Sequence, residues 1–463
     1  MSPIREGYVV PSGPGRGPAD WSVEIAEEER RVADERAWLG ELLRSVESAP
    51  PETAVSVLAQ LLARRLAATE VSFLITDLGG KAVVRLTGAA AEGGPTQPRR
   101  IQLRGSVYER VVRSQQVHVA SVEGSGAGGA GLVQVIAPVS DRGDAIGLLE
   151  LTVPDRPDHQ TRQLIVDAAH ALAYVVIVNR RFTDLYEWGR RTTRLSLAAE
   201  IQHRLLPDSF TCDTGRFIVA GAMEPAADIG GDTFDYTLDR HALHLSLTDA
   251  MGHDVQAALL ATMVVGALRN ARRAGSSLLD QAQDAHQAVA DYADRAHQAF
   301  DAQSEQVRQA VIRHGGQVMA TGQLLRLDLD TGQTTFVNAG HVWPLRLRDG
   351  QVEELTPLVD LPFGVTPNPG YRLQSLDLRQ GDRLLLLTDG MLEPRGTEAD
   401  LGNLLGQTGD WHPRDAVRLF TETVLELSNH DPRDDATVLC LDWPAPNAPY
   451  TGRRADNKQT STS

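Results

Sequence analysis

The sequence predicts an α/β (α+β) protein with two domains joined by a long helix, and three observations lead to this fold class. Its 463 residues are more than one ordinary hydrophobic core holds. Strand-like and helix-like patterns alternate on both sides of residues 179–206. From His159 to about Leu206 the pattern is helical throughout, and no proline interrupts it before Pro207.

These patterns divide the chain into five parts. We expect a disordered terminus and a charged helix over 1–50, a first domain over 51–178, a helical connector over 179–206, a second domain over 207–443, and a disordered tail over 444–463.

The composition limits the function and the compartment. Acidic residues outnumber basic ones by 61 to 45, and the formal net charge of -16 argues against nucleic acid or an anionic membrane as a partner. Cys212 and Cys440 lie far apart without a CxxC pattern, as expected in a reducing compartment. The most apolar run, Leu172 to Val178, is too short to cross a bilayer, and the N-terminus lacks an apolar signal segment. We therefore expect a soluble, cytoplasmic protein without a membrane segment.

The first domain is predicted from alternating helical and strand-like periodicities. The expected elements are a helix over 52–67, strands over 71–76 and 82–88, a helix over 107–113, and strands over 132–139 and 145–153.

The second domain repeats this mixture with more strands. The expected elements are strands over 216–223 and 243–249, helices over 254–273 and 277–314, strands over 319–330, 333–341, 371–378 and 384–387, a helix over 413–427, and a strand over 436–443. The helix over 254–273 is apolar nearly all round, which predicts deep burial. The Leu run over 384–387 predicts a strand that is buried on both faces.

Acidic residues stand at the ends of several of these strands. Asp232 follows two glycines, Asp249 ends a strand before Met-Gly, Asp389 follows the Leu run, and Asp434 and Asp435 precede the last strand. A single Asp in such a place is usually a turn former. If the strands share one sheet system, however, these carboxylates can converge on a pair of metal ions, which clamp a phosphoryl group and acidify a water molecule.

Six motifs occur in an order that resembles the metal-dependent Ser/Thr phosphatases (PPM family), in their SpoIIE-like branch. They are IGGDTFD, DAMGHD, NAGH, LPFGV, LTDGMLE and RDDATVL, and they cover about residues 207–443. The resemblance implies an αββα sandwich with two Mn²⁺ or Mg²⁺ ions between its sheets. It implies hydrolysis of phosphoserine or phosphothreonine on a protein, by analogy an anti-sigma-factor antagonist.

The same resemblance assigns the site residues. The implied metal ligands are Asp232, Asp249, the carbonyl of Ala250, Asp389 and Asp434, with Asp435 kept as the adjacent possibility. The implied catalytic residues are Asp232, Asp249, Asp389 and Asp434. The implied close-approach glycines are Gly231, Gly252 and Gly390, and residues 338–341 are implied to form a turn beside the site.

The chain also departs from the family pattern. Thr233 replaces the usual aromatic residue, Asp254 replaces a glycine, and residues 226–228 contain no phosphate-binding arginine. His253 does not align with the histidine of the relatives, so it is a weak candidate for a general acid.

The order of elements over residues 51–178 resembles a GAF domain, a sensory and dimerisation module. This resemblance implies an unknown ligand or signal and a homodimer formed through the GAF domain and the connector. Residues 198–207 look like the connector that precedes SpoIIE-like phosphatase domains, with Ala198, Ile201 and Leu205 on one helical stripe.

Three other functions remain open at this point. A diguanylate cyclase is suggested by Gly230-Gly231-Asp232-Thr233-Phe234, which differs from GGDEF by one residue, although that residue is the central carboxylate. A non-catalytic regulator that only binds partners is the second alternative. A histidine kinase is a weaker possibility, because no Gly-rich ATP lid is apparent in the C-terminal half.

Overall fold

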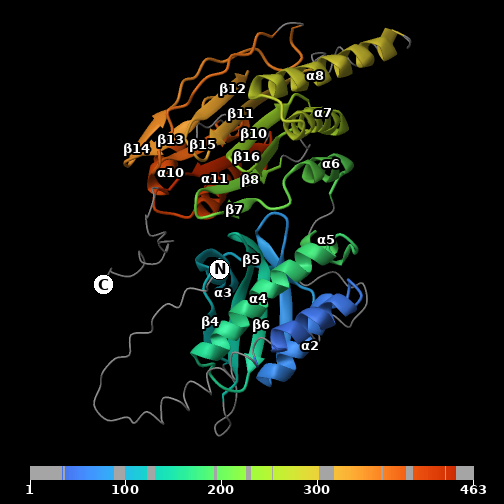
Figure 1. The fold of residues 1–463 in the computed structure, drawn as a ribbon, viewed down its shortest axis with the longest axis vertical. Coiled ribbons are helices and arrows are strands. Elements are labelled where there is room, and N and C mark those ends of the chain that lie inside the picture. Colours follow the sequence, from blue (N-terminus) through green and yellow to red (C-terminus); the bar gives the residue numbers. More distant parts are fainter. Residues whose placement is uncertain are drawn as a thin grey trace, which may run out of the picture.

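The computed structural model describes most of the two predicted domains. The described residues are 34, 37–87, 100–122, 131–191, 195–225, 231–252, 254–301, 318–366, 369–392, 400–432 and 434–444. The predictions of disorder at the N-terminus and after residue 444 lie outside the described residues. In Figure 1 the N-terminal domain, coloured from blue to green, lies below the C-terminal domain, coloured from lime to red.

The N-terminal domain is one antiparallel sheet with helices on both faces. Its strands are in the order β3-β2-β1-β6-β5-β4. In β1, Phe73 and Ile75 face the core under α2 and α4, whereas Leu74 faces the smaller core under α3. The elements are α2 (Ala54–Leu66), β1 (Glu70–Thr76), β2 (Ala82–Arg85), β3 (Arg100–Gln102), α3 (Val107–Ser114), β4 (His118–Ser121), β5 (Val133–Asp141), β6 (Asp144–Val153) and α4 (His159–Asn179). The predicted helices and strands are present, and residues 37–48 form the expected earlier helix.

The prediction of one continuous connecting helix is wrong. The structure has three helices instead: α4, α5 (Leu185–Arg190) and α6 (Leu197–Leu205). Polar side chains start the later two, because the Thr183 hydroxyl accepts from the Leu185 amide at 3.2 Å and the Ser196 hydroxyl accepts from the Ala199 amide at 3.2 Å. Gly189 lies so close to Leu86, the residue after β2, that an added Cβ would be 2.6 Å from Leu86 Cδ2. Helix α5 therefore packs against the N-terminal domain as a separate element.

Helix α4 bears on the expectation that the chain has no membrane segment, which stays a prediction. By length and composition alone, this helix is apolar and long enough to cross a membrane, which the short run over 172–178 did not suggest. Part of it packs in the core of the N-terminal domain, where Ile165, Leu172 and Val176 are buried.

The C-terminal domain is a sandwich of two antiparallel sheets with helices outside each sheet. The four-stranded sheet has the order β12-β11-β10-β9, and the six-stranded sheet has the order β14-β13-β15-β16-β8-β7. Helices α7 and α8 cover the first sheet, and α10 and α11 cover the second (Figure 1). This arrangement confirms the expected αββα layers.

The elements of this domain follow the predicted order closely. They are β7 (Thr211–Asp213), β8 (Ile218–Glu224), β9 (Thr233–Leu238), β10 (Ala242–Ala250), α7 (Asp254–Arg273), α8 (Leu278–Asp301), β11 (Ala320–Asp328), β12 (Thr334–Ala339), β13 (Leu345–Arg348), β14 (Gln351–Glu354), β15 (Arg383–Leu387), the 3₁₀ turn η1 (Asp389–Met391), α10 (Leu401–Gln407), α11 (Pro413–Leu427) and β16 (Ala436–Asp442). Residues 371–378 form no named strand, contrary to prediction, although Gln374 pairs with Phe336.

The main core of this domain lies between its two sheets. Leu243, Leu245 and Leu247 of β10 contact apolar side chains of β15 and β16 in this core. The opposite face of β10 is also buried, because α7 covers it. Burial on both faces holds the strand ends in fixed positions.

Helix α7 is less buried than the sequence predicts. Leu260, Val264 and Leu268 pack against the four-stranded sheet, as expected. Val255 and Met263, however, are 37% and 38% exposed, and together with Leu259 they form an apolar strip on the outer side.

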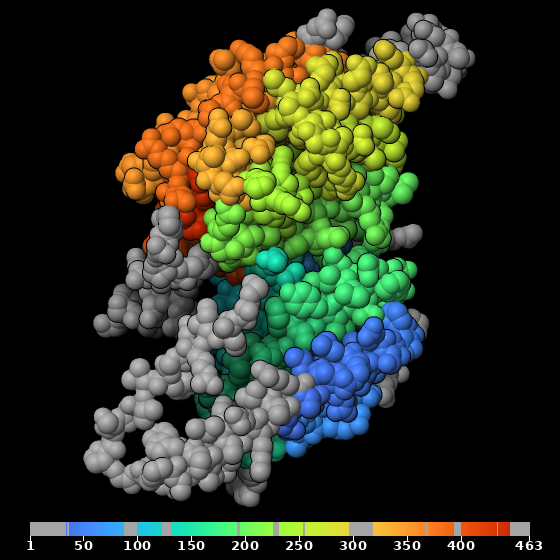
Figure 2. Space-filling model, in the orientation of Figure 1, coloured from blue at the N-terminus to red at the C-terminus, as the bar shows by residue number. Residues whose placement is uncertain are grey.

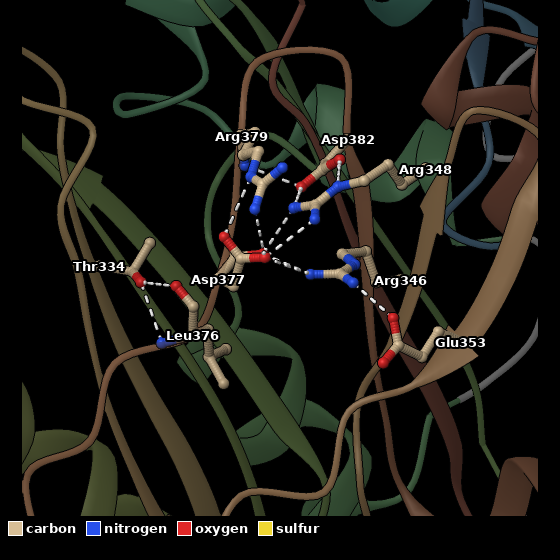
Figure 3. Close-up of polar contacts among 8 residues, drawn as sticks. All are labelled: Thr334, Arg346, Arg348, Glu353, Leu376, Asp377, Arg379 and Asp382. Atoms are coloured by element: carbon tan, nitrogen blue, oxygen red, sulfur yellow. Dashed lines mark hydrogen bonds and ion pairs between the residues drawn. The ribbon is translucent and has the colours of Figure 1, made fainter.

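A polar network fastens the segment before β15 to the edge of the six-stranded sheet (Figure 3). The Arg348 guanidinium binds both carboxylate oxygens of Asp382 at 2.7 Å and also contacts Asp377 at 2.9 Å. Arg346 binds the backbone carbonyl of Asp377 and the carboxylate of Glu353. Bidentate Arg–carboxylate pairs give strong geometric restraint, so the entry into β15, which leads to Asp389, is held in place.

The two domains contact each other directly (Figure 2). The Asp213 amide of β7 donates to the Arg142 carbonyl in the β5–β6 turn at 2.8 Å. Lys81 pairs with Glu224, at the end of β8, at 2.7 Å. A cavity of about 200 Å³, lined by residues of both domains, remains between them.

Candidate metal centre

Antiparallel strand pairing gathers the predicted carboxylates. Strand β9 begins opposite the end of β10, with Thr233 paired to Thr248, so Asp232 and Asp249 lie at the same edge of the four-stranded sheet. Strand β15 ends opposite the beginning of β16, which likewise places Asp389 beside residues 434–435. Each sheet therefore presents acidic residues at one edge.

Two threonine hydroxyls join these edges across the sandwich. Thr388, directly before Asp389, donates to Asp232 Oδ2 at 2.8 Å, and Thr437 of β16 donates to the same oxygen at 2.6 Å. Asp232 itself is only 2% exposed. The acidic edges of the two sheets consequently form one cluster.

Gln202 of the connecting helix α6 also enters this cluster. Its Nε2 donates to the backbone carbonyl of Asp232 at 2.9 Å and to Asp435 Oδ2 at 2.6 Å. Gln202 and Asp435 are each 1% exposed. The helix that joins the two domains thus bonds directly to residues of both acidic edges.

Two of the three predicted close-approach glycines have that role. A Cβ on Gly231 would lie 2.2 Å from the Ala250 carbonyl oxygen, and a Cβ on Gly390 would lie 2.1 Å from the carbonyl oxygen of Asp435. Gly252 instead has a φ of +117°, which disfavours residues with a side chain, and it has no comparably close neighbour. The backbone around the cluster is therefore packed too tightly for side chains at positions 231 and 390.

The phosphatase resemblance implies hydrolysis of a phosphoserine peptide with Mn²⁺ or Mg²⁺. Gly231→Ala is expected to reduce turnover of such a peptide, and the affinity for Mn²⁺, by more than about tenfold, because the new methyl group must displace the Ala250 carbonyl. Gly266→Ala in α7 is the matched control, since a Cβ there meets nothing within 4 Å. The measurement is turnover against Mn²⁺ concentration, with thermal unfolding of both variants in parallel. A Gly231→Ala curve equal to that of Gly266→Ala would contradict this account.

The carboxylates strongly perturb one another. Burial, together with the charges of Asp249 and Asp435, raises the pKa of Asp232 well above its ordinary value. Burial and the charges of Asp389, Asp434 and Asp435 raise the pKa of Asp249 to about 7. Burial also raises the pKa of Asp434. None of these carboxyl groups has a cationic side chain among its principal electrostatic neighbours.

The donor set suits hydrated divalent cations. Asp389 and Asp434 are exposed, Asp249 is half-buried, and Asp232 and Asp435 are buried, so the cluster runs from solvent into the sandwich. In the described residues, no group of three or more Asp, Glu, His or Cys side chains is arranged to hold an ion by side chains alone. Mg²⁺ commonly uses one or two carboxylates and keeps several waters, which fits carboxylates spread along an edge.

The structure brings every predicted carboxylate to this edge, and their roles as ligands stay predictions. Ala250 is buried, and its amide donates to the Gly231 carbonyl at 3.3 Å. Asp434 Oδ1 accepts from the Asp435 amide, whereas the Asp435 side chain is bound by Gln202. This difference leaves Asp434 as the more accessible member of the doublet. His253 and residues 226–228 lie outside the described residues.

The predicted turn at residues 338–341 is present beside the cluster. The Asn338 side chain accepts from the His341 amide at 2.7 Å and donates to the His341 carbonyl at 3.0 Å. The His341 ring contacts the Leu387 carbonyl at 2.9 Å and Thr321 Oγ1 at 2.7 Å. Burial lowers the pKa of His341 to about 4, so the ring is neutral at pH 7 and fixes the end of β15.

The sequence did not predict the contacts of four residues that organise the cluster, Gln202, Thr388, Thr437 and His341, although His341 is part of the predicted turn. Three of them stand inside the motifs LTDG, DDAT and NAGH, where a hydroxyl or imidazole beside an acidic strand end is a usable signal. Gln202 lies about 30 residues before Asp232, and no local pattern links the two.

Comparison with known proteins shows similarity in the C-terminal domain. Residues 239–444 match the protein-family model described as Stage II sporulation protein E (SpoIIE). The phosphoserine phosphatase RsbP of Bacillus subtilis (strain 168) is 24% identical over 254 residues, covering 54% of this chain and 57% of RsbP. The phosphoserine phosphatase RsbU of the same organism is 21% identical over 260 residues, covering 54% of this chain and 70% of RsbU. The SiaA-PP2C domain of Pseudomonas aeruginosa, a solved structure, is 21% identical with a TM-score of 0.41, covering 52% of this chain and 93% of that one. The chain thus matches little more than half the length of RsbP.

Proposed function

We propose that this chain, whose C-terminal domain is a phosphatase domain of the SpoIIE/PP2C type, is a metal-dependent protein serine/threonine phosphatase. One observation carries the proposal. Five carboxylates from two sheets meet at one edge without a cationic partner among the principal neighbours of Asp232, Asp249 and Asp434. Such a cluster is costly unless cations neutralise it.

The carboxylates at this edge have different roles. Asp232 and Asp435 are held by hydroxyl and amide donors inside the sandwich, which fixes the geometry. Asp249 stands between them and the exposed Asp389 and Asp434. When two Mn²⁺ or Mg²⁺ ions are bound, they supply a clamp for the phosphoryl oxygens and acidify a water molecule.

No side chain in the described part of the site is suited to be the nucleophile. The hydroxyls of Thr388 and Thr437 donate to a buried carboxylate. The hydroxyls of Thr233 and Thr248 bond to each other at 2.6 Å. Both cysteines are buried in other parts of the fold. Water is therefore the proposed nucleophile, and the carboxylates position it.

The proposed substrate is a phosphoserine or phosphothreonine on a protein. The names of RsbP and RsbU support phosphoserine. By analogy with the SpoIIE-like branch, the substrate protein is proposed to be an anti-sigma-factor antagonist.

The test of this function is hydrolysis of phosphopeptides by the full chain in the presence of Mn²⁺. We expect turnover of phosphoserine and phosphothreonine peptides and no conversion of GTP to a cyclic dinucleotide. Absence of phosphatase activity with any phosphopeptide, in a folded sample, would overturn the proposal.

The diguanylate cyclase alternative has less support in the structure. Thr233, at the position where GGDEF has its central carboxylate, is 1% exposed and bonded to Thr248 inside the sandwich. A threonine in this place supplies no carboxylate, and its hydroxyl is already bonded to Thr248.

We further propose that the GAF-like N-terminal domain regulates the site through α6. The stripe of Ala198, Ile201 and Leu205 packs against the C-terminal domain, chiefly α7, so the seam is formed within one chain. Gln202 on the same helix bonds to both acidic edges. A shift of α6 therefore changes the geometry of the metal centre. The ligand or signal, and a homodimer through this region, stay predictions.

Gln202→Ala is expected to weaken the apparent Mn²⁺ affinity roughly tenfold, because removal of a side chain that positions metal ligands typically has this effect. Ile201→Asp places a charge in the seam against α7, and it should likewise lower turnover at limiting Mn²⁺. Gln163→Ala on the exposed side of α4 is the control, since the Gln163 amide donates to Asp167 one turn away on the same helix. Turnover against Mn²⁺ concentration gives the affinities. Identical curves for the three variants would mean that α6 only tethers the domains.

A further inference from the structure

We propose that an apolar groove beside Asp389 binds an apolar side chain of the protein substrate, next to its phosphoserine. This inference rests on the proposed phosphatase function and adds a determinant of substrate choice. The apolar lining of the groove is formed by Val342, Trp343, Leu345, Val359, Leu387 and Leu392.

The groove lies at the same edge of the six-stranded sheet as the carboxylates. Strand β13 runs antiparallel to β15, so Leu345 at the start of β13 is beside the end of β15, where Leu387 precedes Asp389 by two residues. On the other side, the Leu392 amide donates to the Asp389 carbonyl at 2.8 Å. Two groove residues therefore flank Asp389 in sequence, and one of them bonds directly to it.

The size and chemistry of the groove suit side chains. Its volume is about 310 Å³, at the lower end of the range for ligand pockets, which is room for one or two apolar side chains. Trp343 is 43% exposed, and Val359 is 41% exposed. Leu358 and Leu361 are also exposed on the segment that carries Val359. Large apolar side chains that gather around one groove indicate a binding surface.

The walls of the groove are fixed in place. The Trp343 indole N–H donates to the Pro357 carbonyl at 3.2 Å, which ties the tryptophan to the segment that carries Val359. The His341 ring contacts the Leu387 carbonyl at 2.9 Å, which ties the base of the groove to β15. A preformed groove loses little entropy when a ligand binds.

A protein substrate is the occupant that this position favours. A phosphoserine at the metal centre leaves its neighbours on the surface, and an extended chain advances only about 3.3–3.6 Å per residue. A residue close to the phosphoserine therefore reaches a groove that begins beside Asp389. The only charged lining residue in the described part of the groove is Glu354, and together with the acidic cluster it disfavours acidic neighbours. We infer a Leu, Met or Phe within three residues of the phosphoserine.

The test compares phosphoserine peptides that differ only in having Leu or Asp at each of these flanking positions. For the wild-type chain with Mn²⁺, we expect one Leu position to lower KM at least about tenfold relative to Asp, with little change in kcat. Trp343→Ala should abolish this preference, whereas Trp343→Phe should retain most of it. Trp188→Ala in α5 is the control, because Trp188 is equally exposed at 43% and lies outside the groove.

Two further readouts separate this proposal from the proposed function. p-Nitrophenyl phosphate has no flanking residues, so its hydrolysis should be unchanged in Trp343→Ala. If the wild type does not hydrolyse p-nitrophenyl phosphate, that result counts against the proposed phosphatase function and not against the groove. Calorimetric binding of a phosphonate analogue of the preferred Leu peptide should weaken about tenfold in Trp343→Ala. An active wild type with no preference between Leu and Asp peptides would overturn the groove proposal alone, as would a preference that survives in Trp343→Ala.

Discussion

Asp249→Asn is expected to reduce turnover of a phosphoserine peptide by roughly 10³-fold or more. Replacing a residue that only supports a metal ligand already reduces metal affinity or activity about 10- to 100-fold, and Asp249 is proposed to be a ligand itself. Asp249 lies between the buried and the exposed carboxylates and is electrostatically coupled to Asp389, Asp434 and Asp435. An amide keeps the shape of the side chain but carries no negative charge to offset a dication. The loss should persist at saturating Mn²⁺, because a positioning defect adds to the loss of affinity.

Asp330→Asn is the matched control for this substitution. Asp330 is an exposed carboxylate in the turn after β11, where it pairs with His241 at 2.7 Å. It lies beyond the opposite end of β11 from Thr321, the residue paired with Asp249. We expect its turnover to stay within about twofold of the wild type, as is usual for exposed positions. Comparable losses in the two variants would show that charge alone, and not the position of Asp249, explains the effect.

The second large effect concerns stability against pH in the absence of metal. Because the folded chain raises the pKa of Asp249 from 3.8 to about 7, this group stabilises the fold most below pH 3.8 and loses that contribution as the pH rises to about 7. The loss corresponds to about 4 kcal/mol, as an order of magnitude. As the pH rises from about 4 to 8, the unfolding free energy of the wild type should therefore fall relative to that of Asp249→Asn.

Chemical denaturation of both proteins in chelator at several pH values provides this difference, in which the titratable groups that do not interact with Asp249 cancel. Added Mn²⁺ at pH 8 should stabilise the wild type by about 2.7 kcal/mol at 100 times its dissociation constant and should stabilise Asp249→Asn much less. A pH-independent difference between the two proteins would contradict the assignment of Asp249 to an acidic cluster.

The sequence was informative wherever a local pattern sets the geometry. Alternation and the Leu run predicted β10 and β15, and glycine beside Asp232 and Asp389 marked the strand ends where carboxylates gather. Antiparallel pairing then makes the convergence of these ends a geometric consequence. The order of six motifs predicted the αββα layers, which periodicity alone could not have specified.

Other features depend on contacts that no local pattern encodes. The helical periodicity over 159–206 is continuous, yet the structure has three separate helices there, and Gly189 of α5 packs against Leu86. The apolar strip of α7 looked buried because composition does not show which face meets a sheet. Gln202 could not be predicted as a partner of Asp435, because the two lie 233 residues apart and tertiary packing alone brings them together.

The most direct measurement of the central claim is turnover of a phosphoserine peptide by the full chain after exhaustive chelation, before and after Mn²⁺ or Mg²⁺ is restored. The carboxylate cluster, with no side-chain nucleophile in its described part, predicts no turnover in chelator and recovery when either ion is added. Turnover that continues undiminished in chelator would contradict the claim that the five carboxylates hold the ions on which hydrolysis depends.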